Sequence, residues 1–414
     1  MSNLFYQIPE ISNTLFGSNV KLLPSVDELF ELELANLEYH ILDKDELIER
    51  SAFFQSVNGN LTKHFELYSV HTQALSENRS AQAKNYFENG QFSTGYATHG
   101  LFPYRGKFHP QLIKGLLNII GIKKTDVVLD PMCGSGTANI EAALMGINSY
   151  AVDQSPFCQF MVKAKFEALT IDVDLMKGLS LKAEKLYNFF DVKDVSAQLE
   201  KITASEKLKV YYLALLAFLD AMGYSLRVTK SNHSQLFKKV LGRYQNTVLD
   251  FLNNPYYKKD TIGFVKVLPN SNALKIELGD SSVDGVITSP PYSFAIDYVK
   301  NDEAQLKYLG YDTETIKSNM IGLVGKNKTE RLNNYFRDME TVCSEVSRVL
   351  KRGKFFIMII GSNTNQTGGI RLENKIIDSC QKYGLTLVKS ILKPIKGMRN
   401  TMKDEYILFF EKTV

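Results

Sequence analysis

Cysteine is scarce in this chain of 414 residues, and long apolar runs are missing. The four cysteines are Cys133, Cys158, Cys343 and Cys380. None of them belongs to a C-x-x-C pair, which argues against a disulfide scaffold or a structural zinc site and suits a reducing cytoplasm. Apolar runs such as Phe355–Ile360 are far shorter than the ~20 residues that cross a bilayer. The amino terminus has no basic stretch leading into an apolar one, so we expect no secretory signal.

The acidic and basic residues are unevenly distributed. Net charge is +4, yet residues 1–100 hold thirteen acidic and six basic residues, and the later chain carries a balance of +11. Residues 221–260 alone hold seven basic and two acidic residues. This asymmetry favours contact between the later part and a polyanion, although a solvated basic face is the simpler alternative.

The length and the distribution of strand patterns predict three regions. A chain of this length exceeds one compact core, and no repeat is visible. Between Phe160 and Asn254 strand patterns are missing, and ~90 residues are too many for a loop. We therefore predict a mostly helical acidic extension over 1–95, one α/β domain formed by 96–160 and 261–414, and a helical insertion over 161–260.

The α/β domain opens with a pattern typical of nucleotide-binding sheets. Val127–Leu129 reads as a strand, a glycine-rich turn and a helix follow, and Ser149–Val152 forms a second strand that ends at Asp153. Strand, glycine turn, helix, strand and acid in that order indicate a doubly wound parallel sheet. Further strands are predicted at 283–288, 355–360, 385–392 and 405–410.

The turn Asp130-Pro-Met-Cys-Gly-Ser-Gly-Thr137 is the first candidate site. Gly134 and Gly136 remove the side chains that would keep a ligand from the backbone amides at a helix amino terminus. Asp153, at the end of the next strand, can accept hydrogen bonds from ribose hydroxyls. The alternative is a plain tight turn with a helix-capping aspartate.

The segment Thr288-Ser-Pro-Pro-Tyr292 is the second candidate site. Its two prolines hold the backbone extended at the end of a strand. The Ser289 side chain and the Pro290 carbonyl can then both accept hydrogen bonds from one amino group, and Tyr292 offers a flat face to a planar base. The alternative is a strand-ending proline turn with a packing tyrosine.

Together the two segments resemble the amino-methyltransferases of DNA, which carry D-P-x-x-G-S-G-T and (S/N/D)-P-P-Y loops. Thr98–Pro110, Ala295–Tyr298 and Asp404–Leu408 resemble further segments of that family. The order of cofactor loop, insert and catalytic loop resembles the family's alpha type. The resemblance implies a seven-stranded Rossmann-like sheet, S-adenosyl-L-methionine as cofactor, and double-stranded DNA as the partner, with a cognate restriction endonuclease as a further candidate partner. His40, His64 and His71 form no metal-ligand spacing with carboxylates, so we assign no metal.

The family's motifs give two sets of site residues on this chain, and the positive charge of the insert gives a third. The catalytic set is Ser289, Pro290, Pro291 and Tyr292. The cofactor-binding set is Lys107, Phe108, Asp130, Pro131, Met132, Cys133, Gly134, Ser135, Gly136, Thr137, Asp153, Gln154, Asn272 and Ala273. The DNA-binding set, taken from the basic part of the insert, is Arg227, Lys230, Lys238, Lys239 and Arg243.

The residues also bear on the methylated base. Ser289 after Thr288 is typical of members that methylate cytosine N4, whereas adenine N6 enzymes more often carry Asp or Asn there. The glycine loop also resembles that of guanine-N2 methyltransferases of RNA, and a catalytically silent DNA-binding subunit is a further alternative. Met132 stands where many members carry Phe, and Cys133 is interpreted as a packing residue.

Overall fold

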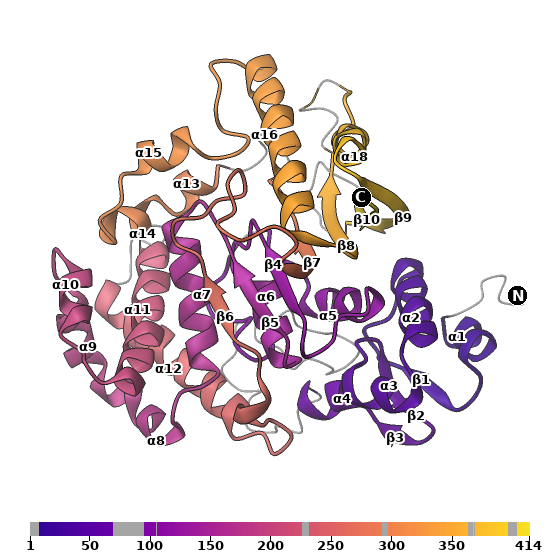
Figure 1. The fold of residues 1–414 in the computed structure, drawn as a ribbon. Helices are drawn as coiled ribbons and strands as arrows, with labels where there is room; N and C mark the ends of the chain where they lie inside the picture. Colours follow the sequence, from indigo (N-terminus) through magenta and orange to yellow (C-terminus); the bar gives the residue numbers. More distant parts are fainter. Residues whose placement is uncertain are drawn as a thin grey trace, which may run out of the picture.

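The computed structural model describes residues 8–68, 95–104, 106–225, 232–291, 297–362, 367, 369–395 and 404–414. A central β-sheet has helices on both faces, an amino-terminal region at one end and a group of helices at the other (Figure 1). Within the described ranges, no helix is long and apolar enough to span a membrane.

The central sheet has seven strands in the order β6-β5-β4-β7-β8-β10-β9. They are β4 (Val127–Asp130), β5 (Asn148–Ala151), β6 (Val265–Val267), β7 (Val283–Thr288), β8 (Leu350–Gly361), β9 (Leu385–Pro394) and β10 (Asp404–Lys412). The first five strands in this order pair in parallel, and β10 runs antiparallel to both neighbours. The predicted doubly wound, mostly parallel sheet is confirmed. The edge strand β6 was missed because three partly exposed residues give little pattern.

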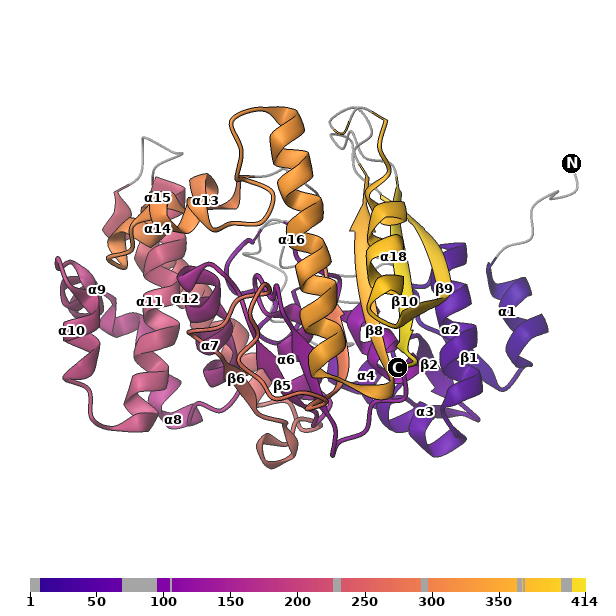
Figure 2. The same cartoon turned by 45° about the horizontal axis from the view of Figure 1, so that its top comes forward.

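Successive side chains of a strand point to opposite faces of the sheet, so alternate residues of these strands belong to two different hydrophobic cores. Val128 and Ile287 pack toward α5 (Pro110–Ile119) and the amino-terminal region. Leu129 and Val286 pack toward the opposite face, which α16 (Lys328–Val349) and α18 (Leu372–Lys382) cover (Figure 2). All six residues of β7 are buried because the sheet is covered on both sides.

The amino-terminal region contains helices and a small antiparallel sheet. Its elements are α1 (Ile8–Phe16), β1 (Val20–Leu22), α2 (Leu29–Ile41), α3 (Lys44–Arg50), β2 (Phe54–Val57), β3 (Asn60–Leu61) and α4 (Lys63–Tyr68). α3 ends at Arg50, and the strand β2 begins at Phe54, so the region is not purely helical. Phe53 packs so closely on α5 that a Cβ at Gly115 would lie 2.4 Å from its ring. The region thus shares its core with the catalytic sheet instead of standing apart.

Among the described residues of 160–254 the regular elements are helices and none is a strand, which agrees with the predicted absence of strands. Its elements are α8 (Val173–Met176), the 3-10 turn η2 (Leu179–Lys182), α9 (Ala183–Phe190), α10 (Val195–Glu200), α11 (Ser205–Ser225) and α12 (His233–Leu252); a second 3-10 turn, η3 (Lys259–Thr261), leads into β6. α7 (Pro156–Ala168) lies between the insert helix α11 and the sheet, whereas α6 (Thr137–Leu144) packs against α5 and β5. α7 runs across the predicted boundary at 160, so the insert is continuous with the helix that follows β5.

Three short helices connect β7 to α16. They are α13 (Tyr298–Asn301), α14 (Glu303–Tyr308) and α15 (Thr313–Ser318). The Gln305 side chain donates to the Leu219 carbonyl at 3.1 Å, which joins α14 to α11. The segment that follows the catalytic strand therefore lies against the carboxyl-terminal half of α11.

Candidate active site

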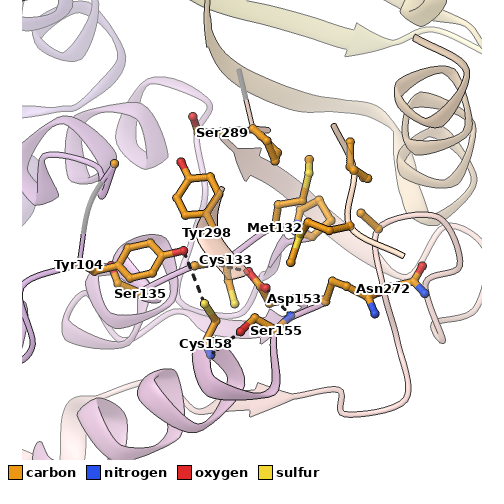
Figure 3. Close-up of a pocket in the computed structure, with 18 of the residues that line it drawn as sticks. Tyr104, Met132, Cys133, Ser135, Asp153, Ser155, Cys158, Asn272, Ser289 and Tyr298 are labelled. Carbon is orange, nitrogen blue, oxygen red and sulfur yellow. Dashed lines mark hydrogen bonds between the residues drawn. The ribbon is translucent and has the colours of Figure 1, made fainter. Parts of the chain in front are cut away.

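One cavity lies at the carboxyl ends of β4, β5 and β7, where ligands bind in open α/β sheets (Figure 3). It contains about 850 Å³ of space, which includes volume open to solvent. Of the residues predicted from the sequence, fourteen line it: Lys107, Phe108, Pro131, Met132, Cys133, Gly134, Ser135, Thr137, Asp153, Gln154, Asn272, Ala273, Ser289 and Pro291. Both candidate loops thus open onto one space.

The glycine loop needs its glycines for conformation and for space. Gly134 and Gly136 have φ values of 49° and 75°, in the left-handed region. A Cβ at Gly136 would lie 2.6 Å from the Val162 side chain, and one at Gly134 would lie 3.1 Å from the Tyr104 ring. The close approach of α7 and of Tyr104 therefore requires glycine at both positions.

The amides of this loop divide into two groups. Cys133 donates to the Val152 carbonyl at 2.9 Å, Gly136 donates to the Cys133 carbonyl at 2.7 Å, and Gly134 donates to Asp153. These three amides hold the loop itself. The amides of Ser135 and Thr137, at the amino terminus of α6, are the candidate donors toward a ligand.

Asp153 is held in the cavity by two backbone amides. One carboxylate oxygen accepts from Gly134 N and the other from Ser155 N, each at 2.8 Å. Burial raises the pKa of Asp153 to about 6, although both hydrogen bonds lower it. Each oxygen keeps a second lone pair, so the carboxylate can also accept hydrogen bonds from a ligand.

The second loop begins where β7 ends. The Thr288 hydroxyl donates to Asp130 Oδ1 at 2.7 Å, so the end of β7 is joined to the end of β4. Ser289 and Pro291 line the cavity, whereas Pro290 does not. Tyr292, predicted to stack on the base, lies outside the described residues.

Asp130 has a different position from the one expected of a cofactor ligand. It is buried beneath the glycine loop and does not line the cavity. Its Oδ1 accepts from Thr288 and from Met132 N, the latter at 3.2 Å. Burial raises the pKa of Asp130 to about 7, and the hydrogen bond from Thr288 opposes that rise. Gly136 likewise does not line the cavity, and its place is set by contact with α7.

The flanking residues predicted for the cofactor are all present at the cavity. Lys107 donates to the His99 carbonyl at 3.0 Å, and burial lowers its pKa to about 8. Asn272 accepts through Oδ1 from Leu274 N and Lys275 N, which forms a turn beside Ala273. Burial raises the pKa of Cys133 well above its ordinary value, which disfavours a thiolate nucleophile and suits a packing residue.

Sequence reasoning did not identify nine residues that line the cavity: Tyr104, Gly106, Ser155, Cys158, Leu274, Tyr298, Asn319, Met320 and Ile321. Tyr104 and Tyr298 lie inside segments that resemble those of the amino-methyltransferases. Their rings are nearly parallel, at an interplanar angle of 15° and a centroid distance of 6.0 Å. The last three residues follow α15, and nothing in their sequence indicates a site.

The basic residues predicted to bind DNA fall into three groups. Lys238 and Lys239 are exposed on α12. Arg243 donates to the buried carboxylate of Asp220 at 2.7 Å, so its charge is partly committed within the protein. Arg227 and Lys230 lie outside the described residues. Where the structure describes the chain, no cluster of three His, Cys, Asp or Glu residues could hold a metal ion.

Two family models match this chain. One, described as DNA methylase, covers residues 283–414, and one described as an RMKL-like methyltransferase domain covers residues 101–216. The chain is 24% identical over 326 residues to the Type II methyltransferase M.BsoBI of Geobacillus stearothermophilus, over 63% of each protein. It is 21% identical over 414 residues to M.MvaI of Kocuria varians, covering 78% of this chain and 90% of that enzyme. A segment of 52 residues is 42% identical to the tRNA (guanine(10)-N2)-dimethyltransferase of Methanothermobacter thermautotrophicus, over 13% and 16% of the two chains.

The order of the sheet, with its single antiparallel strand, and the two loops on one cavity define a methyltransferase. Residues 283–414, catalytic loop included, match the family model described as DNA methylase. The chain is thus similar to the DNA amino-methyltransferases. It spans less than two thirds of the first relative's length.

S-adenosylmethionine is the cofactor of this family, and the cavity fits it. Gly134, the amides of Ser135 and Thr137, and the partly buried acceptor Asp153 form a cradle at the carboxyl end of the sheet. Lys107 adds a cation that can face the carboxylate of an amino acid.

Proposed function

We propose that this protein transfers a methyl group from S-adenosylmethionine to the exocyclic amine of a flipped DNA base, with cytosine N4 as the first candidate. The observation that carries the proposal is the Thr288–Asp130 hydrogen bond, which joins the ends of the two strands that lead into the cofactor loop and the catalytic loop. Because Ser289 lines the same cavity as Gly134 and Asp153, an amine bound at Ser289 would lie beside the bound cofactor.

The base must leave the duplex before it can react. Stacking and pairing hide its amine, and flipping the base costs a few kcal/mol. Ser289 Oγ and the Pro290 carbonyl would accept hydrogen bonds from the amine and draw the nitrogen toward tetrahedral geometry. In that geometry the lone pair of the nitrogen is no longer delocalised into the ring and can attack the methyl group. Tyr292 is proposed to stack on the base, a contact worth about 1–3 kcal/mol.

The other contribution of the protein is to align the amine with the methyl group of the cofactor. S-adenosylmethionine supplies a methyl group that is already activated on a positively charged sulfur. The two loops hold the amine in line with that methyl group, and this positioning supplies most of the rate. The amine becomes acidic only as it gains the methyl group, so no strong base is needed, and its proton can leave through Ser289 to water.

Mass spectrometry of DNA nucleosides tests the reaction and the base together. DNA from cells expressing the protein should contain N4-methylcytosine, and the Ser289→Ala variant should abolish it. If the DNA contained N6-methyladenine instead, the protein would still be a DNA amino-methyltransferase, but its target base would be adenine and not cytosine. Unmodified DNA, despite cofactor binding by the purified protein, would favour the catalytically silent subunit.

A guanine-N2 methyltransferase of RNA is the second candidate. The short match to the tRNA enzyme favours it. Two observations favour DNA: the DNA methylase model covers the catalytic loop, and the first hundred residues are acidic, which suits RNA poorly. The same measurement on tRNA and rRNA decides between them, because N2-methylguanosine in those RNAs would replace the DNA proposal.

Double-stranded DNA is the proposed partner, and a cognate restriction endonuclease is a further one. We propose that the exposed side of α12, with Lys238 and Lys239, and the segment 300–331 face the duplex. α14 lies against α11, the helix that precedes α12 in the insert, so the two groups of residues belong to neighbouring elements. The acidic amino-terminal region would face away from the duplex.

A further inference from the structure

The wall of the cavity that carries Tyr104 is attached to the insert. Leu101 and Phe102 belong to the hydrophobic core of the insert helices, together with Tyr244 and Phe157. The Phe102 ring packs against the Phe157 ring with centroids 5.0 Å apart. Two residues further on, Tyr104 lines the cavity with its ring close to Gly134. The insert core therefore determines where this wall lies.

Phe102 has a backbone conformation that a bulky residue rarely adopts. Its φ is 63°, in the left-handed region, and such a conformation persists only where the surroundings hold it. The Phe102 carbonyl accepts from Tyr104 N at 3.0 Å, so the conformation of Phe102 directs the chain toward the cavity. Phe102 is only 6% exposed, and its amide needs a partner inside the protein.

The partner is a side chain from the insert. The Phe102 amide donates to Tyr244 Oη at 2.7 Å, and this hydroxyl donates to Asp220 Oδ2 at 3.0 Å. Arg243 donates to the same Asp220 oxygen. Tyr244 and Asp220 are buried, so the charge on Asp220 is compensated by these donors, and they in turn fix the Tyr244 hydroxyl.

We propose that Tyr244 is a positioning residue of the cofactor pocket: by holding the Phe102 amide, it keeps the Tyr104 ring in place beside Gly134. The insert, predicted to recognise the DNA target, thus also shapes the S-adenosylmethionine site. The identity of the ligand rests on the proposed function, whereas the hydrogen-bonded link from Asp220 to Phe102 does not.

The variant Tyr244→Phe tests the link because it removes one hydroxyl and preserves the ring. Titration calorimetry with S-adenosylmethionine should show binding about tenfold weaker, the equivalent of one net hydrogen bond. The matched control is Tyr257→Phe. The Tyr257 hydroxyl likewise bonds to the backbone, but as a donor, to the Leu169 carbonyl at 2.7 Å. Leu169 follows the end of α7 that is remote from Ser155 and Cys158, about 20 Å along that helix.

Hydrogen exchange supplies a readout that a general loss of stability would not produce. Amide protection of the peptide covering residues 99–104 should fall in Tyr244→Phe and stay unchanged in Tyr257→Phe. Asp220→Asn weakens the same link from its other end and should lower cofactor affinity about threefold. It replaces Tyr244→Phe if that variant does not fold.

Parental cofactor affinity and parental exchange in Tyr244→Phe would overturn the proposal, and so would an equal loss of affinity in the Tyr257→Phe control. If the unaltered protein bound no S-adenosylmethionine, the proposed function would fail, and the exchange measurement would still decide whether Tyr244 holds Phe102.

Discussion

The two loops of the active site lie at the same edge of the sheet but are held in different ways. The glycine loop is fastened from several sides by Val152, Asp153 and the buried amine of Lys165, which donates to the Ser135 carbonyl at 3.2 Å. The Ser-Pro-Pro loop contains two residues without an amide hydrogen. The strand end before it pairs with β8 through Thr288 and Met358, and the Thr288 side chain donates to Asp130 at the end of β4. We infer from this difference that the glycine loop mainly sets the affinity for the cofactor, whereas the Ser-Pro-Pro loop mainly aligns the reacting groups. Variants of the glycine loop should therefore change the cofactor Kd, and variants of the Ser-Pro-Pro loop should change the rate of methyl transfer.

The largest effect is expected for Ser289→Ala. Loss of an acceptor for the amine should lower the single-turnover rate by roughly 100-fold or more, whereas the cofactor Kd should stay unchanged because the glycine loop is intact. Single-turnover assays with saturating DNA measure the rate. Ser196→Ala, at an exposed position on α10, is the control. A parental rate would make the loop merely structural.

Replacement of Asp153 tests the cofactor half. Asp153→Ala removes the acceptor that holds Gly134 N and Ser155 N, and should weaken S-adenosylmethionine binding by about 1–3 kcal/mol, as for a lost hydrogen bond to a charged group. The turnover rate with saturating cofactor should change much less. Calorimetry across the pair Asp153→Ala and Asp153→Asn measures the affinity, and equal affinity in all three proteins would contradict the assignment.

The pH dependence sharpens the same point. Because the pKa of Asp153 is raised from 3.8 to about 6 in the folded protein, this group destabilises the fold as pH rises from about 4 to 6, since the folded state then holds the proton more strongly than the unfolded one. Cofactor affinity should change in the opposite sense and weaken as pH falls through about 6, where the carboxylate is lost. Calorimetry at pH 5 and pH 7 measures this difference, and Asp153→Asn should remove it.

The sequence allowed the cofactor half to be predicted further than the catalytic half and the insert. Gly134, Gly136 and Asp153 are recognisable because their roles depend on local spacing between a strand, a turn and the next strand. The role of Asp130 could not be predicted, because its partner Thr288 is 158 residues away. Tyr104 was not predicted to line the cavity for a similar reason, because its position depends on Phe102 and on packing with the insert.

The Thr288–Asp130 bond provides an intermediate effect. Thr288→Val keeps the shape and removes the donor, so the loops should lose their mutual alignment. We expect a methyl-transfer rate about tenfold lower, the equivalent of one net hydrogen bond, with unchanged cofactor Kd. Thr288→Ser should restore the rate because it retains the hydroxyl.

The pH–rate profile separates this alignment from a general loss of stability. The Thr288 donor lowers the pKa of Asp130, which burial raises to about 7. Removal of the Thr288 hydroxyl in Thr288→Val should raise the pKa of Asp130 and move the acidic limb of the pH–rate profile toward higher pH. Thr288→Ser keeps a hydroxyl and should leave the acidic limb where it is. Superimposable profiles for all three proteins would show that the bond only stabilises the fold.

The smallest effect concerns the proposed DNA-facing surface of α12. Reversal of Lys238 and Lys239 to Glu should flatten the slope of log affinity against log salt by roughly 0.9 for each phosphate that the protein no longer neutralises, and should weaken all DNA sequences alike. Lys44 begins α3 and Lys124 precedes β4, and both side chains are exposed, so the reversal of these two lysines is the charge-matched control. Fluorescence anisotropy on a short duplex measures both slopes. An unchanged slope for the Lys238 and Lys239 reversal would mean that these lysines only solvate α12, and that the duplex lies against another surface such as the segment 300–331.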